Sequence, residues 1–105
     1  MFALATGFSV MTPSPALASG QTGNVTYIAL ADSRILFQLT GSRTARPGCD
    51  CCDRWEVSAT TDQGRAILAL LMTARAQGTP VEITGTGSCV AGSNDTEGVN
   101  YIQFN

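Results

Sequence analysis

The chain of 105 residues contains no histidine and no lysine. Histidine is the commonest general base and the commonest metal ligand in proteins, so the usual residue for each role is absent here. A Ser-His-Asp triad or a Cys-His nucleophile cannot be built from this sequence. The acidic residues form no pair that suggests an acid/base couple, and no glycine-rich phosphate-binding loop precedes a helix. We expect a protein that is not an enzyme and that needs no cofactor.

Charge is also scarce, because only 13% of the residues are charged. Six arginines are outweighed by eight acidic residues, which leaves a formal net charge of −2. A nucleic-acid-binding protein normally carries a basic patch or stripe, so this balance excludes nucleic acid as an expected partner. Threonine, serine and glycine supply most of the polar surface, as in many exported β proteins.

The N-terminal region has the pattern of a secretory signal peptide. Residues 2–11 are uncharged and mostly apolar, and they are followed by the small-residue motif Ala16-Leu17-Ala18. The run is shorter than the roughly 20 apolar residues that span a bilayer as a helix. No basic residue precedes it, so the leader is atypical or begins further upstream; the alternative is an N-terminal strand or buried helix. We expect cleavage of residues 1–18 and one secreted or periplasmic domain, residues 19–105, without stable membrane insertion.

The mature part alternates between strand-like and helix-like patterns. Runs rich in β-branched and aromatic residues predict strands, and a stretch with a 3.6-residue apolar period predicts one helix between the third and fourth strands. The predicted strands are 25–30, 35–39, 54–59, 81–85 and 99–104, and the helix is 62–77. In the third strand Trp55 and Val57 are expected to face inward and Arg54 and Glu56 outward. This β-β-β-α-β-β order predicts a mainly β fold, a five-stranded barrel of the OB type; the alternative is an open α+β sheet.

The helix has recognisable ends and an extended apolar surface. Thr60 and Gln63 fit a capping box, and Gly78 stands where a C-terminal cap is expected. The residues at helical spacing on the expected core face are Ile67, Leu70, Leu71 and Ala74. Leu68 and Met72 lie well round the helix from them, where a surface helix should be polar. We interpret this second side as a self-association surface; the alternative is packing under barrel loops.

The four cysteines, Cys49, Cys51, Cys52 and Cys89, all fall in the mature part. Export and an even number of cysteines favour disulfides over free thiols. One disulfide from the cluster to Cys89 would join the start of the third strand to the end of the fourth. If Cys49 is the partner, the closed loop of roughly 41 residues is worth about 4 kcal/mol in the chain-entropy model. Cys51 or Cys52 could take its place, and an intermolecular bridge is also open.

Two further interpretations concern ligands. The four cysteines could instead make a periplasmic metal or redox protein, since thiolates bind zinc and Cu(I), although C-x-C-C with one distant cysteine fits zinc spacing poorly. Separately, Asn94, Asp95 and Glu97 cluster in a predicted loop and could bind sugar hydroxyls or a cation. The alternative for this loop is a solvated turn.

Several of these motifs together resemble a known group. Arg54-Trp55 is followed by the Gly64–Met72 helix segment, then by Gly78-x-x-Val81-x-Ile83-x-Gly85-Thr86-Gly87-x-Cys89 and Glu97-x-Val99-x-Tyr101-Ile102. This order resembles a group of small exported bacterial proteins. It is similar, more distantly, to the B subunits of subtilase cytotoxin and other pertussis-like toxins.

The resemblance implies an OB fold, assembly into a homo-oligomer that is a pentamer in the toxins, and a cell-surface glycan as ligand. It also implies that the Leu68 and Met72 side of the helix would line the pore of a ring. Fold alone does not fix function. A structural envelope protein without a small ligand is therefore the remaining alternative.

Overall fold

The computed structural model describes residues 19–104, and the predicted signal peptide lies outside the described residues. The described chain forms six strands and one helix. In chain order these are β1 (Gly20–Gly23), β2 (Val25–Ala31), β3 (Arg34–Leu39), β4 (Trp55–Ser58), α1 (Asp62–Gln77), β5 (Val81–Cys89) and β6 (Glu97–Phe104). The fold is mainly β, as predicted, and all six strands belong to one sheet.

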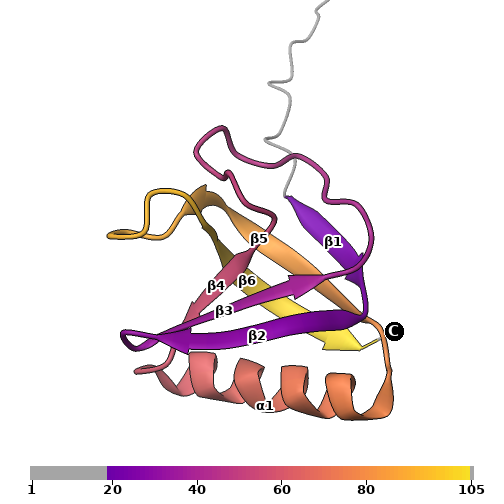
Figure 1. Cartoon of the computed structure of the whole chain (residues 1–105). Helices are drawn as coiled ribbons and strands as arrows, with labels where there is room; N and C mark the ends of the chain where they lie inside the picture. The colour runs from indigo at the N-terminus through magenta and orange to yellow at the C-terminus, as the bar shows by residue number, and fades with distance from the viewer. Residues whose placement is uncertain (1–18, 105) are drawn as a thin grey trace, which may run out of the picture.

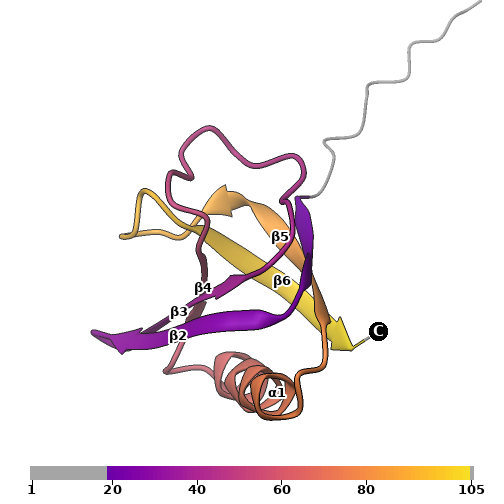
Figure 2. The same ribbon diagram turned by 45° about the vertical axis from the view of Figure 1, so that its right-hand side comes forward.

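The sheet is curled into a half-barrel (Figures 1 and 2). Its strand order is β1-β5-β6-β4-β3-β2, so its two edge strands are consecutive in the chain and are separated only by Asn24. The Asn24 carbonyl accepts a hydrogen bond from the Thr40 amide at 2.9 Å, which ties this corner to the end of β3. All neighbouring strands are antiparallel except β4 and β6, which are parallel.

The expected number of five strands was wrong, because the polar segment before β2 forms strand β1 along β5. Gln21 is buried in this strand, yet its amide is fully used. Its Oε1 accepts from Trp55 Nε1 at 2.8 Å, and its Nε2 donates to the Gly41 carbonyl at 2.8 Å. Gly23 passes so close to the Thr40 backbone that a Cβ there would overlap it. A strand held by such contacts has no apolar alternation to reveal it in the sequence.

The β2–β3 hairpin turns through Asp32 and Ser33. Both residues have positive φ angles, 51° and 65°, which suits the right-handed twist of a two-residue hairpin. Several predicted strand bounds moved. β4 begins at Trp55, β5 continues to Cys89, and β6 begins at Glu97, so the connection between β5 and β6 is 90–96.

Helix α1 has the predicted bounds, but its N-cap is Thr61 and not the expected Thr60. The Thr61 hydroxyl accepts from the Gly64 amide at 3.0 Å, while Gln63 donates to the Asn100 carbonyl at 3.2 Å. Gly64 has no room for a side chain, because a Cβ would overlap the Ser58 carbonyl. At the other end Gly78 caps the helix in the left-handed region, with φ of 65°. Among residues 19–104 no helix is long and apolar enough to cross a membrane.

The hydrophobic core lies between the concave face of the sheet and α1, which covers one open end of the half-barrel (Figures 1 and 2). Trp55 and Val57 face this core, as expected. The residues buried there are Val25, Ile35, Phe37, Leu39, Trp55, Val57, Ile67, Leu71, Ala74, Val81 and Ile83. Leu70 was expected among them but is 40% exposed. The buried stripe of the helix is narrower than predicted and runs through Gly64, Ile67, Leu71 and Ala74.

Candidate functional site

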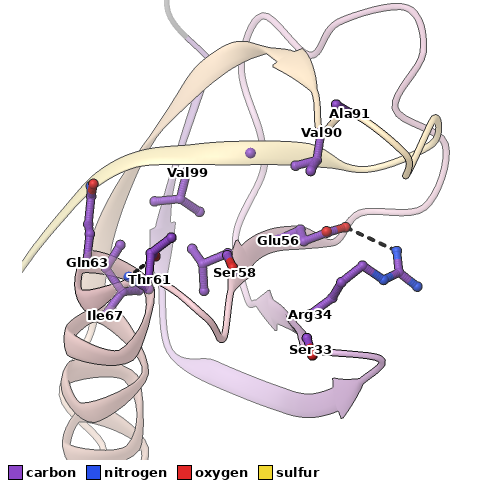
Figure 3. Close-up of a pocket in the computed structure, with 13 residues that line it drawn as sticks. Ser33, Arg34, Glu56, Ser58, Thr61, Gln63, Ile67, Val90, Ala91 and Val99 are labelled. Carbon is purple, nitrogen blue, oxygen red and sulfur yellow. Dashed lines mark hydrogen bonds and ion pairs between the residues drawn. The ribbon is translucent and has the colours of Figure 1, made fainter.

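The main candidate site is a pocket at the point where β4 and β6 separate. The two strands pair at only two positions, Trp55 with Glu97 and Glu56 with Gly98. Beyond them the start of α1 fills part of the gap, and a cavity of about 360 Å³ remains. Figure 3 shows Arg34 and Glu56 at one end and Thr61 and Gln63 at the other. The volume falls within the range of small-molecule sites.

A charged pair stands at the rim of the pocket. Arg34 Nη1 lies 3.3 Å from Glu56 Oε1 and donates to the Ser93 hydroxyl at 2.7 Å. Glu56 was expected to point into solvent, but its side chain is only 3% exposed, whereas that of Arg34 is 37% exposed. The expectation failed because Glu56 lies opposite Leu36, which is buried. Arg34 contacts Glu56 on the same face of the sheet and also binds Ser93. The pocket therefore offers a carboxylate acceptor and a guanidinium donor side by side.

The rest of the lining combines apolar walls with a few neutral polar groups. Ile67 and Val57 come from the core side, and Val90 and Val99 from the β6 side. Ser58 and Gln63 add a hydroxyl and an amide, as Figure 3 shows. The lining residues are Ser33, Arg34, Glu56, Val57, Ser58, Thr61, Gln63, Gly64, Ile67, Val90, Ala91, Gly98 and Val99. Such a mixture suits a small ligand that has both an apolar face and several hydrogen-bonding groups.

The structure does not bring the three expected ligand-loop residues to one surface. Asn94 and Asp95 are exposed in the connection between β5 and β6. Glu97, in contrast, opens strand β6 with its side chain fully buried. It accepts from the Gly87 amide at 2.9 Å and from the Ser19 hydroxyl, and it pairs with Arg43 at 2.7 Å. The placement of Glu97 in a ligand loop was therefore wrong, since these internal donors hold it inside.

Glu97 belongs to a buried charge cluster at the end of the half-barrel away from α1. The Arg43 side chain is 1% exposed and is shared between Glu97 and Asp50, whose Oδ2 lies 2.8 Å from Arg43 Nη1. Arg43 also donates to the Arg54 carbonyl at 2.8 Å. The Asp50 oxygens have no hydrogen bond of good geometry, so Asp50 is held by charge alone. The cluster therefore links the β3–β4 loop to β6.

Burial lowers the pKa of Arg43, while the adjacent Asp50 and Glu97 carboxylates act in the opposite direction. An arginine remains protonated under such conditions, so the cluster holds one cation between two carboxylates. Sequence reasoning missed Arg43 and Asp50 because both stand in a segment that has the composition of a loop. No local pattern links Arg43 to a carboxylate 54 residues away.

The cysteines form two disulfides, and no described cysteine is free. Cys49 is bonded to Cys89 across a sequence separation of 40, with 6.4 Å between their Cα atoms. This confirms a bridge from the cluster to Cys89. Cys51 and Cys52 are bonded to each other. Four thiolates are therefore not available together as metal ligands in this oxidised protein.

The two residues expected on the self-association side of α1 differ in position. Met72 is 57% exposed, whereas Leu68 is partly buried and packs against the core. Met72 lies in a groove between α1 and β2, together with Tyr27 and Ile28. Tyr27 is 41% exposed and Leu30, further along β2, is 70% exposed. Met72, Tyr27 and Ile28 thus form an apolar patch between α1 and β2.

Comparison with known proteins gives no relative for this chain: no protein-family model matches it, nor does any curated protein or solved structure.

Proposed function

We propose that this chain is an exported, non-catalytic binding module that holds a hydroxyl-rich ligand, a glycan, in the pocket between β4 and β6. The observation that carries the proposal is the Arg34–Glu56 pair at the rim of a pocket with apolar walls. A guanidinium only donates hydrogen bonds and a carboxylate only accepts them. Neighbouring hydroxyl groups of a sugar can satisfy both at once, while the less polar face of the ring lies against Val99 and Ile67.

The proposal includes a barrel of the OB type. Its support is the position of β1 and β2, which are separated by one residue and lie at the two edges of the sheet. Counted as two halves of one bent strand, they reduce six strands to five and leave α1 between the third and fourth. That is the strand count and helix position of an OB barrel.

Export to the periplasm or to the medium is supported by the disulfides. Bonds such as Cys49–Cys89 persist in oxidising compartments and are rare in a reducing cytosol. The apolar run and the Ala16-Leu17-Ala18 motif in the sequence point the same way. A domain of this size also gains much from a covalent cross-link, because a small chain buries a modest core.

Self-association is the second part of the proposal, and the exposed Met72 and Tyr27, which line one groove, support it. Exposed apolar residues that gather on one face commonly mark an interaction surface. The more distant resemblance to toxin B subunits suggests a ring of five copies. Repeated copies would also multiply weak glycan contacts into useful avidity.

Binding to a panel of immobilised mono- and oligosaccharides, both neutral and acidic, tests the proposed function. Arg34→Gln and Glu56→Gln should each weaken the binding of any retained sugar about tenfold or more, as expected for loss of a hydrogen bond to a charged group. Arg65→Gln is the matched control, because Arg65 is exposed, pairs with Asp62 and does not line the pocket. The proposal fails if no sugar binds, or if both pocket variants bind as well as the control.

A further inference from the structure

The Cys51–Cys52 disulfide does not join distant parts of the fold. In the chain-entropy model a cross-link stabilises a protein by closing a loop, and the effect grows with the length of that loop. Cys49–Cys89 spans 40 positions, whereas Cys51 and Cys52 are adjacent. Cys51 and Cys52 are also exposed. The fold therefore has little need of this bond, and a reductant can reach it.

An acidic residue from the opposite loop lies against this pair. The Cys51 amide donates to the Asp95 carbonyl at 3.1 Å, which fixes the two loops together. The two Sγ atoms and a carboxylate oxygen of Asp95 all lie within 4.8 Å of one another. The Asp95 side chain is 52% exposed and is held by Arg54 at 3.5 Å. Two sulfurs and one carboxylate thus converge on one accessible point.

We propose that Cys51, Cys52 and Asp95 form a redox-gated site for a soft divalent cation such as Zn²⁺ or Cd²⁺. In the oxidised protein neither sulfur is a thiolate, which is the form that binds a metal, so the site is closed. A dithiol reductant opens it by thiol–disulfide exchange: the reductant becomes a disulfide, and Cys51 and Cys52 gain two electrons and two protons as thiols. Binding one M²⁺ then forms two metal–sulfur bonds and releases the two protons.

The chemistry of the donors selects the class of cation. Thiolates favour soft and borderline metals, and a carboxylate oxygen is a common additional ligand of Zn²⁺. Hard cations such as Mg²⁺ and Ca²⁺ prefer sites made of oxygen alone. Water would complete the coordination on the open side. None of the three residues lines the Arg34–Glu56 pocket, so the site is independent of the proposed glycan ligand.

Stepwise reduction of the purified chain tests the gate. The chain is treated with increasing concentrations of a dithiol reductant, alkylated, and analysed by peptide mass spectrometry. Cys51 and Cys52 should be alkylated first, while Cys49–Cys89 stays intact and far-ultraviolet circular dichroism is unchanged. The gate is refuted if the Cys49–Cys89 bond opens first, or if both disulfides open over the same concentration range.

Cadmium binding to the mildly reduced chain tests the site itself, through the ultraviolet charge-transfer absorption of cadmium–thiolate bonds. One equivalent should bind to the reduced chain and none to the oxidised chain. Asp95→Asn should weaken cadmium binding by at least about tenfold. Even the loss of a residue that only contacts a metal ligand lowers the metal affinity by about that factor. Cys52→Ser should abolish the binding of this one equivalent of cadmium.

The matched control is Asp53→Asn, because Asp53 is an exposed acid in the same loop that pairs instead with Arg46. Its cadmium affinity should equal that of the unmodified chain. An equal loss of cadmium affinity in the Asp53 and Asp95 variants would show that only the net charge of the loops matters. That result would overturn the assignment of Asp95 as a ligand. Equal binding by the oxidised and reduced chains would overturn the whole site.

Discussion

The Arg43 guanidinium lies over the indole ring of Trp55, 3.8 Å from the ring centroid. Trp55 is fully buried, and its Nε1 donates to Gln21, so the ring is fixed from both sides. A cation over an aromatic face is attracted by the ring quadrupole. The same guanidinium pairs with both Asp50 and Glu97, and it thereby connects the hydrophobic core to the loop that carries Cys49.

Replacing Arg43 should strongly destabilise the fold. Arg43→Met keeps an unbranched apolar chain but leaves Glu97 buried without a cation and Asp50 with Arg46 alone, at 3.6 Å, at a cost of about 3–5 kcal/mol. The free energy of unfolding from urea titration measures it. Arg65→Met is the control, because the exposed Arg65–Asp62 pair is worth at most about 1 kcal/mol. Equal effects of the two substitutions would show that the Arg43 cluster has no special role.

The two disulfides should differ sharply in their contribution to stability. The double variant Cys49→Ser/Cys89→Ser should lose about 4 kcal/mol in the chain-entropy model. The Cys51–Cys52 bond closes no long loop. The double variant Cys51→Ser/Cys52→Ser should therefore unfold almost as the unmodified chain does. Thermal unfolding of the two variants side by side measures the difference. A larger loss for the Cys51/Cys52 variant would contradict the assignment of Cys49–Cys89 as the structural cross-link.

Met72 offers the cleanest test of self-association. Leu68 packs against the core, so Leu68→Asp would confuse an interface effect with unfolding. Met72→Asp changes an exposed residue and should convert the assembly to single chains, with unchanged circular dichroism. Thr73→Asp is the matched control, because Thr73 is the exposed neighbour on the next helix position. Light scattering of all three proteins gives the mass; an unmodified chain that is already monomeric would refute the interface.

Local signals explain which parts of the fold could be predicted. The helix follows from its apolar period and from Gly78, and the strands 25–30 and 35–39 follow from their β-branched and aromatic residues, because these signals lie within a few residues of each other. Strand β1 could not be predicted, since Gln21 stands where a strand usually buries an apolar residue. Its side-chain oxygen accepts a hydrogen bond from Trp55, 34 positions away. Propensity scales cannot register a hydrogen bond that depends on the finished fold.

The site residues divide in the same way. A disulfide from the cysteine cluster to Cys89 could be predicted, because export and an even number of cysteines favour disulfides. The sequence alone left Cys49, Cys51 and Cys52 open as its partner. Glu56 and Glu97 were expected at the surface or in a loop, since an acidic residue is rarely buried unless it is paired. Their partners, Arg34 and Arg43, lie 22 and 54 positions away. Only the curled sheet brings each pair together, so the pocket could not be anticipated.

We place the proposed sugar in the pocket between β4 and β6. The most direct test is a titration of the ¹⁵N-labelled chain with a saccharide retained in the binding screen, followed through backbone amide shifts. We predict that the largest shifts occur at Ser58, Gly64 and Val99, which line the pocket. Shifts concentrated at Asn94 and Asp95, or no saturable shift at all, would show that no sugar occupies this pocket.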